Sequence, residues 1–95
     1  MATYISLIRF TEQGVRNIKK SVDRAHAFDQ AAEKAGVTIE GQYWTLGPYD
    51  GVLIISADES KKALHCLAEL TAYGNFSIQT LTAFEDTEFA AIVED

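Results

Sequence analysis

The residues best suited to chemistry gather around a predicted turn near the middle of the chain. Residues 43–51 read Tyr-Trp-Thr-Leu-Gly-Pro-Tyr-Asp-Gly, which is typical of a strand end, a tight turn and the start of the next strand. Pro48 presets φ, and Asp50 can hydrogen-bond to its own backbone, so the segment predicts a hairpin. Tyr49 and Asp50 would then offer a phenol and a carboxylate to a small ligand, because loops on a rigid scaffold often carry binding groups. In the structural alternative, Asp50 stabilises the turn and Tyr49 covers the sheet edge.

Three other side chains are candidates for binding a ligand near this turn. Tyr43 and Trp44 are consecutive on a predicted strand and therefore point to opposite faces, so only one of them can line a given pocket. Such aromatic residues also serve as core or interface anchors. Arg9 lies near the end of the first predicted strand, where a guanidinium reaches water, pairs with a carboxylate or clamps an anionic ligand. The predicted ligand-binding set is Arg9, Tyr43, Trp44, Tyr49 and Asp50, and the sequence indicates no catalytic residue.

The histidines and the cysteine show no pattern of a metal site or an activated nucleophile. His26 and His65 are far apart and lack any two-histidine ligand spacing, so we expect no metal. Cys66 follows His65 on a predicted helix, where adjacent side chains diverge by about 100°, which excludes a Cys–His dyad. The sequence contains no glycine-rich phosphate loop and no dinucleotide fingerprint, so we predict no cofactor.

Composition and charge narrow the possible partners. The 95 residues predict one domain, residues 1–95. Fourteen acidic against eight basic residues give a net charge of −6, which argues against nucleic acid and against an anionic membrane surface. The single cysteine fits a reducing compartment, the first residues lack the features of a signal peptide, and the apolar runs are too short to span a bilayer. We therefore expect a cytoplasmic protein.

Hydrophobic periodicity predicts the elements that position these residues. Alternating or β-branched apolar runs indicate four strands, and apolar residues at helical spacing indicate two main helices. The strands are expected near residues 3–10, 37–46, 51–57 and 75–84. The helices are expected near residues 21–35 and 58–73.

Residues that start and stop helices set the expected boundaries. Thr11 is predicted to cap a short helical stretch that runs to Lys20 and is interrupted by Gly14. Ser21 and Asp58 are the expected N-caps of the two main helices, and Gly36 and Gly74 are expected to end them. The apolar face of the second main helix is predicted to consist of Leu64, Leu67 and Leu70.

The element order is β-α-β-β-α-β, the pattern of an α+β, ferredoxin-like fold. Right-handed crossovers place both helices on one face of a four-stranded antiparallel sheet. Because at least two strands are apolar on both sides, a bare second face would expose a patch too large for a typical monomer. We therefore expect a homodimer, or a higher homo-oligomer, in which two sheets pack face to face.

Three separated parts of the chain resemble a bacterial family, the GYD-domain proteins. The stretch Tyr-Trp-Thr-Leu-Gly followed by Tyr-Asp is similar to the motif that names the family, and similar segments flank it; the resembling positions are 4–11, 13–14, 16–19, 43–47, 49–50, 80–81, 83–84 and 88–89. The resemblance covers essentially the whole chain. It implies a ferredoxin-like fold of the dimeric α/β-barrel type and implies no established activity.

Three functions stay open at this point. The first is a non-catalytic homo-oligomeric protein that binds a small metabolite between sheet and helices. The second is a small cofactor-independent enzyme of oxygenase, isomerase or dehydratase type, a hypothesis that rests on analogy of fold. The third is a regulatory domain that presents its acidic C-terminal segment, with a possible docking stripe of Phe89, Ile92 and Val93, to a protein partner. The lack of a convincing acid–base pair ranks the first above the second.

Overall fold

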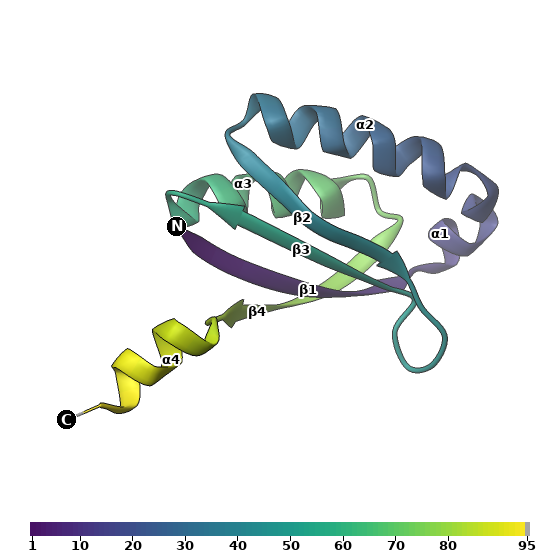
Figure 1. Ribbon diagram of the computed structural model, residues 1–95. Helices are drawn as coiled ribbons and strands as arrows, with labels where there is room; N and C mark the ends of the chain where they lie inside the picture. The colour runs from purple at the N-terminus through teal and green to yellow at the C-terminus, as the bar shows by residue number, and fades with distance from the viewer. Residues whose placement is uncertain (95) are drawn as a thin grey trace.

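The computed structural model describes residues 1–94 and consists of a four-stranded antiparallel sheet with two long helices over one face (Figure 1). The strands lie in the order β2-β3-β1-β4. This arrangement confirms the ferredoxin-like α+β fold. In chain order the elements are β1 (Ala2–Phe10), α1 (Glu12–Arg16), the 3-10 turn η1 (Ile18–Lys20), α2 (Ser21–Lys34), β2 (Val37–Trp44), β3 (Gly51–Ala57), α3 (Ser60–Ala72), β4 (Phe76–Ala83) and α4 (Asp86–Val93).

The strands and the two long helices lie within two residues of their predicted bounds, but the N-caps predicted for these two helices are wrong. Ser21 is the first residue of α2 rather than its cap, because η1 runs directly into the helix. Glu59 takes the N-cap position of α3. Asp58 instead contacts Lys62 at 3.1 Å from Oδ1 to Nζ, and this hydrogen-bonded ammonium lowers the pKa of the Asp58 carboxyl. Gly36 and Gly74, each with φ of 81°, follow the ends of α2 and α3 as predicted.

A close approach of two backbones explains the glycine in the first short helix. The Oγ1 of Thr11 accepts a hydrogen bond from the Gly14 N–H at 3.1 Å, which confirms Thr11 as the cap of α1. Gly14 is buried, and a Cβ at this position would overlap the carbonyl oxygen of Asn75. The prediction that Gly14 interrupts this helix is therefore wrong. Gly14 lies within α1 and lets it pack against the start of β4.

The hydrophobic core lies between the sheet and the two long helices. On β3 the residues that face the helices alternate with residues that face away, as the pleat of a strand requires. Leu64 is 68% exposed, so the prediction that it belongs to the buried face of α3 is wrong. The buried apolar residues are Ala32, Val37, Leu53, Ile55, Ala57, Ala63, Cys66 and Leu67.

The other face of the sheet has no helix over it (Figure 1). The strand register aligns two rows of apolar side chains across this helix-free face. All of them are at least partly exposed, and Tyr43 and Leu81 are the most exposed at 60% and 50%. Contiguous apolar surface of this kind marks an interaction site in a small domain. We call these residues the apolar patch: Leu81, Ile5 and Ile54 in one row and Leu7, Val52 and Tyr43 in the next.

The last helix, α4, extends away from the sheet beyond the end of β4 (Figure 1). Its start is fixed by Glu88 Oε1, which accepts a hydrogen bond from the Glu85 N–H at 2.9 Å. Phe89, Ile92 and Val93 recur at helical spacing and are 57%, 60% and 61% exposed. The sequence predicted this stripe but not the helix that carries it. Among residues 1–94, no helix combines the length and the apolarity needed to cross a membrane.

Candidate functional site

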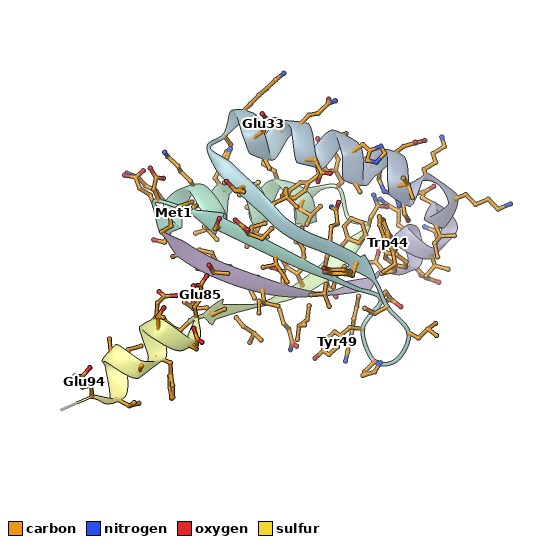
Figure 2. The ribbon with its side chains drawn as sticks, in the orientation of Figure 1. Met1, Glu33, Trp44, Tyr49, Glu85 and Glu94 are labelled. Atoms are coloured by element: carbon orange, nitrogen blue, oxygen red, sulfur yellow. The ribbon has the colours of Figure 1, made fainter. Side chains whose placement is uncertain are left out.

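The turn between β2 and β3 brings Tyr49 and Arg9 together at the edge of the helix-free face. The Arg9 guanidinium carbon lies 4.8 Å from the centroid of the Tyr49 ring, and Arg9 Nε donates a hydrogen bond to the Pro48 carbonyl at 3.0 Å. The Tyr49 hydroxyl donates to Gln79 Oε1 on β4 at 2.8 Å. Tyr49 therefore lies over the neighbouring strands, beside the apolar patch, rather than in open solvent (Figure 2).

Asp50 fastens the turn to the sheet. Its Oδ2 accepts a hydrogen bond from the Phe10 N–H at 2.8 Å, and its own N–H donates to the Ile8 carbonyl at 2.7 Å. Asp50 thus bonds to the backbone of β1, whereas the sequence predicted a bond to its own backbone. Thr45 closes the turn, because its hydroxyl donates to the Tyr49 carbonyl at 2.6 Å. The carboxylate of Asp50 has a clear structural role here.

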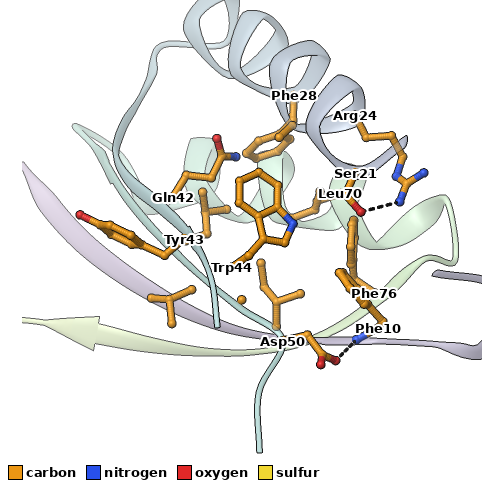
Figure 3. A pocket seen from close by; sticks show the side chains of 15 residues that line it. Phe10, Ser21, Arg24, Phe28, Gln42, Tyr43, Trp44, Asp50, Leu70 and Phe76 are labelled. Atoms are coloured by element: carbon orange, nitrogen blue, oxygen red, sulfur yellow. Dashed lines mark hydrogen bonds between the residues drawn. The ribbon is translucent and has the colours of Figure 1, made fainter. Parts of the chain in front are cut away.

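The five predicted site residues are divided between the two sides of the sheet. Trp44 and Asp50 border a small cavity on the side of the helices, whereas Arg9, Tyr43 and Tyr49 belong to the other side; Tyr43 also borders this cavity, but its ring points away from it (Figure 3). A bulge in β2 between Ile39 and Gly41 sets this division. The bulge adds one residue and reverses the alternation, which puts Tyr43 on the face opposite Ile39.

The small cavity, which we call the inner cavity, has a volume of about 60 Å³ and lies under the start of α2 (Figure 3). The Trp44 indole points toward Phe28 of α2 across it. The buried hydroxyl of Ser21 accepts a hydrogen bond from Arg24 Nη2 at 3.3 Å at its edge. The side chains around it are mainly aromatic and aliphatic, and they include Phe10, Phe28, Trp44, Leu70 and Phe76.

A larger cavity of about 270 Å³ lies between α2 and α3, and we call it the interhelical cavity. Its α2 wall consists largely of alanines, which leave space between the two helices. Its α3 wall carries Cys66 and Leu70, with His65 and Glu69 toward solvent, where His65 Nε2 and Glu69 Oε1 are 3.4 Å apart. Apolar walls with a few polar groups at the rim are typical of small-molecule sites.

Arg24 is the residue that sequence reasoning missed. It borders both cavities, and its guanidinium carbon lies 5.9 Å from the centroid of the Phe76 ring. The available signal was its spacing: Arg24 stands four residues before Phe28, so it projects toward the buried side of α2. A cation beside the buried stripe of a helix is unusual enough to identify a candidate binding group.

Cys66 and the histidines give no second site. Burial, and to a smaller extent the Glu69 carboxylate, raise the pKa of the Cys66 thiol, so the thiol is poorly suited to act as a nucleophile. Both histidines are exposed. Within residues 1–94 no three histidine, cysteine or acidic side chains are grouped so that they would hold a metal ion.

Comparisons with known proteins place the chain in a family. The model of the GYD domain matches residues 4–93. A protein of Thermus thermophilus named "Glutamine synthetase and cystathionine beta-lyase binding protein" is 29% identical over 92 residues, which cover 96% of this chain and 97% of that protein. The search of solved structures found no match.

Proposed function

The chain belongs to the GYD domain family, and from this premise we propose that it is a non-catalytic, homo-oligomeric domain that acts in the cytoplasm by binding another protein. The observation that carries the proposal is the exposed stripe of α4. A helix that presents three large apolar side chains to solvent gains most when a partner covers them. The full-length similarity to a protein named for binding two enzymes supports the same conclusion.

Self-association is the first part of this proposal. The six residues of the apolar patch are contiguous across all four strands. A second copy packed sheet to sheet would remove them from water, and each square ångström of apolar surface so buried is worth about 25 cal/mol. Homodimers bury this kind of surface through the same patch on both subunits.

Recognition of a partner protein by α4 is the second part. Its stripe is flanked by Asp86 and Glu88, so the surface that receives the helix should be an apolar groove with basic residues at its rim. A relative is named for binding two enzymes, so we propose that the partner is a metabolic enzyme, with glutamine synthetase and cystathionine β-lyase as the first candidates.

Direct binding assays test this function. The purified chain is titrated against glutamine synthetase and against cystathionine β-lyase from the same organism, with surface plasmon resonance as the readout. We expect saturable binding to at least one of the enzymes, with the double variant Phe89→Ser/Ile92→Ser at least about tenfold weaker. The matched control Ile18→Ser/Val22→Ser changes two aliphatic side chains that are 48% and 52% exposed elsewhere on the surface and should bind as wild type. Absence of binding to both enzymes, or equal binding by the α4 variant, would contradict the proposal.

A second candidate function is the binding of a small metabolite between the sheet and the helices. The inner and interhelical cavities favour it, because apolar walls and a cation meet there. Native mass spectrometry of freshly purified protein tests it. A retained small molecule of constant mass is the expected result, and the bare protein mass in every preparation would contradict it.

A further inference from the structure

The two cavities lie next to each other, and Arg24 borders both. They are bordered in common by four side chains from α2, α3 and β4, namely Arg24, Phe28, Leu70 and Phe76. The cavities, of about 60 and 270 Å³, are therefore neighbours that share a wall, and Arg24 is part of that wall.

The hydrogen-bond partners of Arg24 are neutral. Its Nη1 donates to the Asn17 carbonyl at 3.0 Å and its Nη2 donates to Ser21 Oγ at 3.3 Å, while Nε is buried with no acceptor within residues 1–94. Among residues 1–94, no ion pair includes Arg24. A partly buried cation without an anionic partner loses hydration and gains little in return, and an unmatched buried N–H adds to the cost.

The two carboxylates that border the cavities lie beside groups other than Arg24. Asp50 Oδ2 accepts the Phe10 N–H at 2.8 Å, and Glu69 Oε1 lies 3.4 Å from His65 Nε2. Among the described residues, the chain thus brings a guanidinium to an apolar space and leaves it without a carboxylate partner. An anionic group of a ligand is the complement that this arrangement lacks.

We propose that the interhelical cavity binds a small amphipathic carboxylate, with its carboxylate group against Arg24 and its apolar body between α2 and α3. The apolar body would lie against Phe28, Leu70 and Phe76 and displace water from the alanine-rich wall of α2. Discrimination would come from Arg24, because a neutral analogue of the same shape gains the apolar contacts but not the charge-assisted hydrogen bond. This inference rests on the second candidate function, the binding of a small molecule in the cavities.

A pair of isosteric probes tests the charge requirement on the unmodified protein. 3-Phenylpropanoate and 3-phenylpropanamide are titrated into the full chain and followed by NMR shifts of the aromatic side chains, together with straight-chain carboxylates of about four to ten carbons and their amides. We expect the best carboxylate to bind at least about tenfold more tightly than its amide. The largest shifts should fall on the rings of Phe28 and Phe76.

Variants then assign the preference to one side chain. In Arg24→Gln the ratio of the two affinities should fall to about one, and in Arg24→Lys it should be intermediate, because an ammonium keeps the charge but not the planar fork. Arg16→Gln, which removes an exposed guanidinium on α1, is the matched control and should keep the wild-type ratio. Circular dichroism melting curves confirm that each variant is folded.

The possible failures are distinguishable. If carboxylate and amide bind wild type equally, the anion inference is wrong while small-molecule binding in the cavities stands. If Arg24→Gln is folded and keeps the preference for the carboxylate, Arg24 is not the anchor and the inference is overturned. If no probe of the series binds at millimolar concentration, the inference is overturned, and the native mass spectra decide the small-molecule function separately.

Discussion

On the central strand β3, the two faces of the sheet carry similar aliphatic residues in different surroundings. On β3, Leu53 and Ile55 point toward the helices and are 1% and 0% exposed, whereas Val52 and Ile54 point the other way and stay partly exposed. A strand that is apolar on both sides is typical of a sheet covered on both faces, and in this chain the helices α2 and α3 cover one face (Figure 1). The proposed homodimer rests on this difference between the faces.

The same contrast separates two arginines. Arg9, on the helix-free side, is exposed and lies over the Tyr49 ring, where its charge remains hydrated. Arg24, on the covered side, is partly buried beside Phe76 and next to two cavities. Because the same functional group is weakly constrained in water and strongly constrained near the core, Arg24 is the better candidate for ligand binding.

The largest effect is expected from the covered face. Leu53→Ala removes a fully buried side chain and leaves a cavity, which should lower the free energy of unfolding by about 2–5 kcal/mol. Leu81→Ala, on the helix-free face, should cost less than about 1 kcal/mol at protein concentrations that hold the chain monomeric. Urea denaturation at low protein concentration measures both, and similar costs would remove the distinction between the faces.

The reactivity of Cys66 measures how well the helices shield the covered side of the sheet from solvent. Its raised pKa and its burial should make alkylation by iodoacetamide at about pH 8 at least about tenfold slower than for the unfolded chain. The pKa of Cys66 is higher in the folded than in the unfolded chain. The protonated thiol therefore contributes fully to the free energy of unfolding below the pKa of a free thiol, and this contribution is lost as the pH rises through the folded-state pKa. Alkylation of the native protein at the rate of the urea-unfolded chain would show that the helices do not shield this side.

The turn should contribute less to stability than the core. Asp50→Ala removes the carboxylate that binds the Phe10 N–H, and we expect a loss of about 0.5–2 kcal/mol in thermal or urea unfolding. Asp50→Asn keeps an acceptor oxygen and should recover part of that loss. If Asp50→Ala melts like wild type but loses a bound ligand, Asp50 serves a binding site instead.

The smallest effect is expected at the rim of the helix-free face. Tyr49→Phe removes one exposed hydrogen bond to Gln79 while it keeps the ring under Arg9, so the free energy of unfolding should change by less than about 0.5 kcal/mol. A loss well above about 1 kcal/mol in the dimer, but not at dilutions that favour the monomer, would place this hydroxyl in the interface between subunits.

Elements that depend on local pattern could be predicted from the sequence. Periodicity located the four strands and two long helices, and Gly36 and Gly74 marked helix ends because positive φ favours glycine. The helix α4 was missed because it is only eight residues long and follows closely on a strand, although the Glu85–Glu88 spacing offered a capping-box signal.

The candidate site was harder to predict because it depends on tertiary geometry. The bulge beyond Ile39 decides which face Tyr43 occupies, and nothing in the local alternation reveals such an insertion. The role of Arg24 depends on how far α2 stands from α3, which the sequence spacing to Phe28 does not specify. Asp50 was correctly placed at the turn, but its partner lies 40 positions away on β1.

The most direct test of the central claim, that a second copy covers the helix-free face, is the mass of the protein in solution. Sedimentation velocity of the wild-type chain at micromolar concentration should give at least twice the 10.5 kDa of one chain. Leu81→Asp, which places a charge in the apolar patch, should shift the population to monomer without unfolding it. A stable wild-type monomer across the micromolar range would contradict the account.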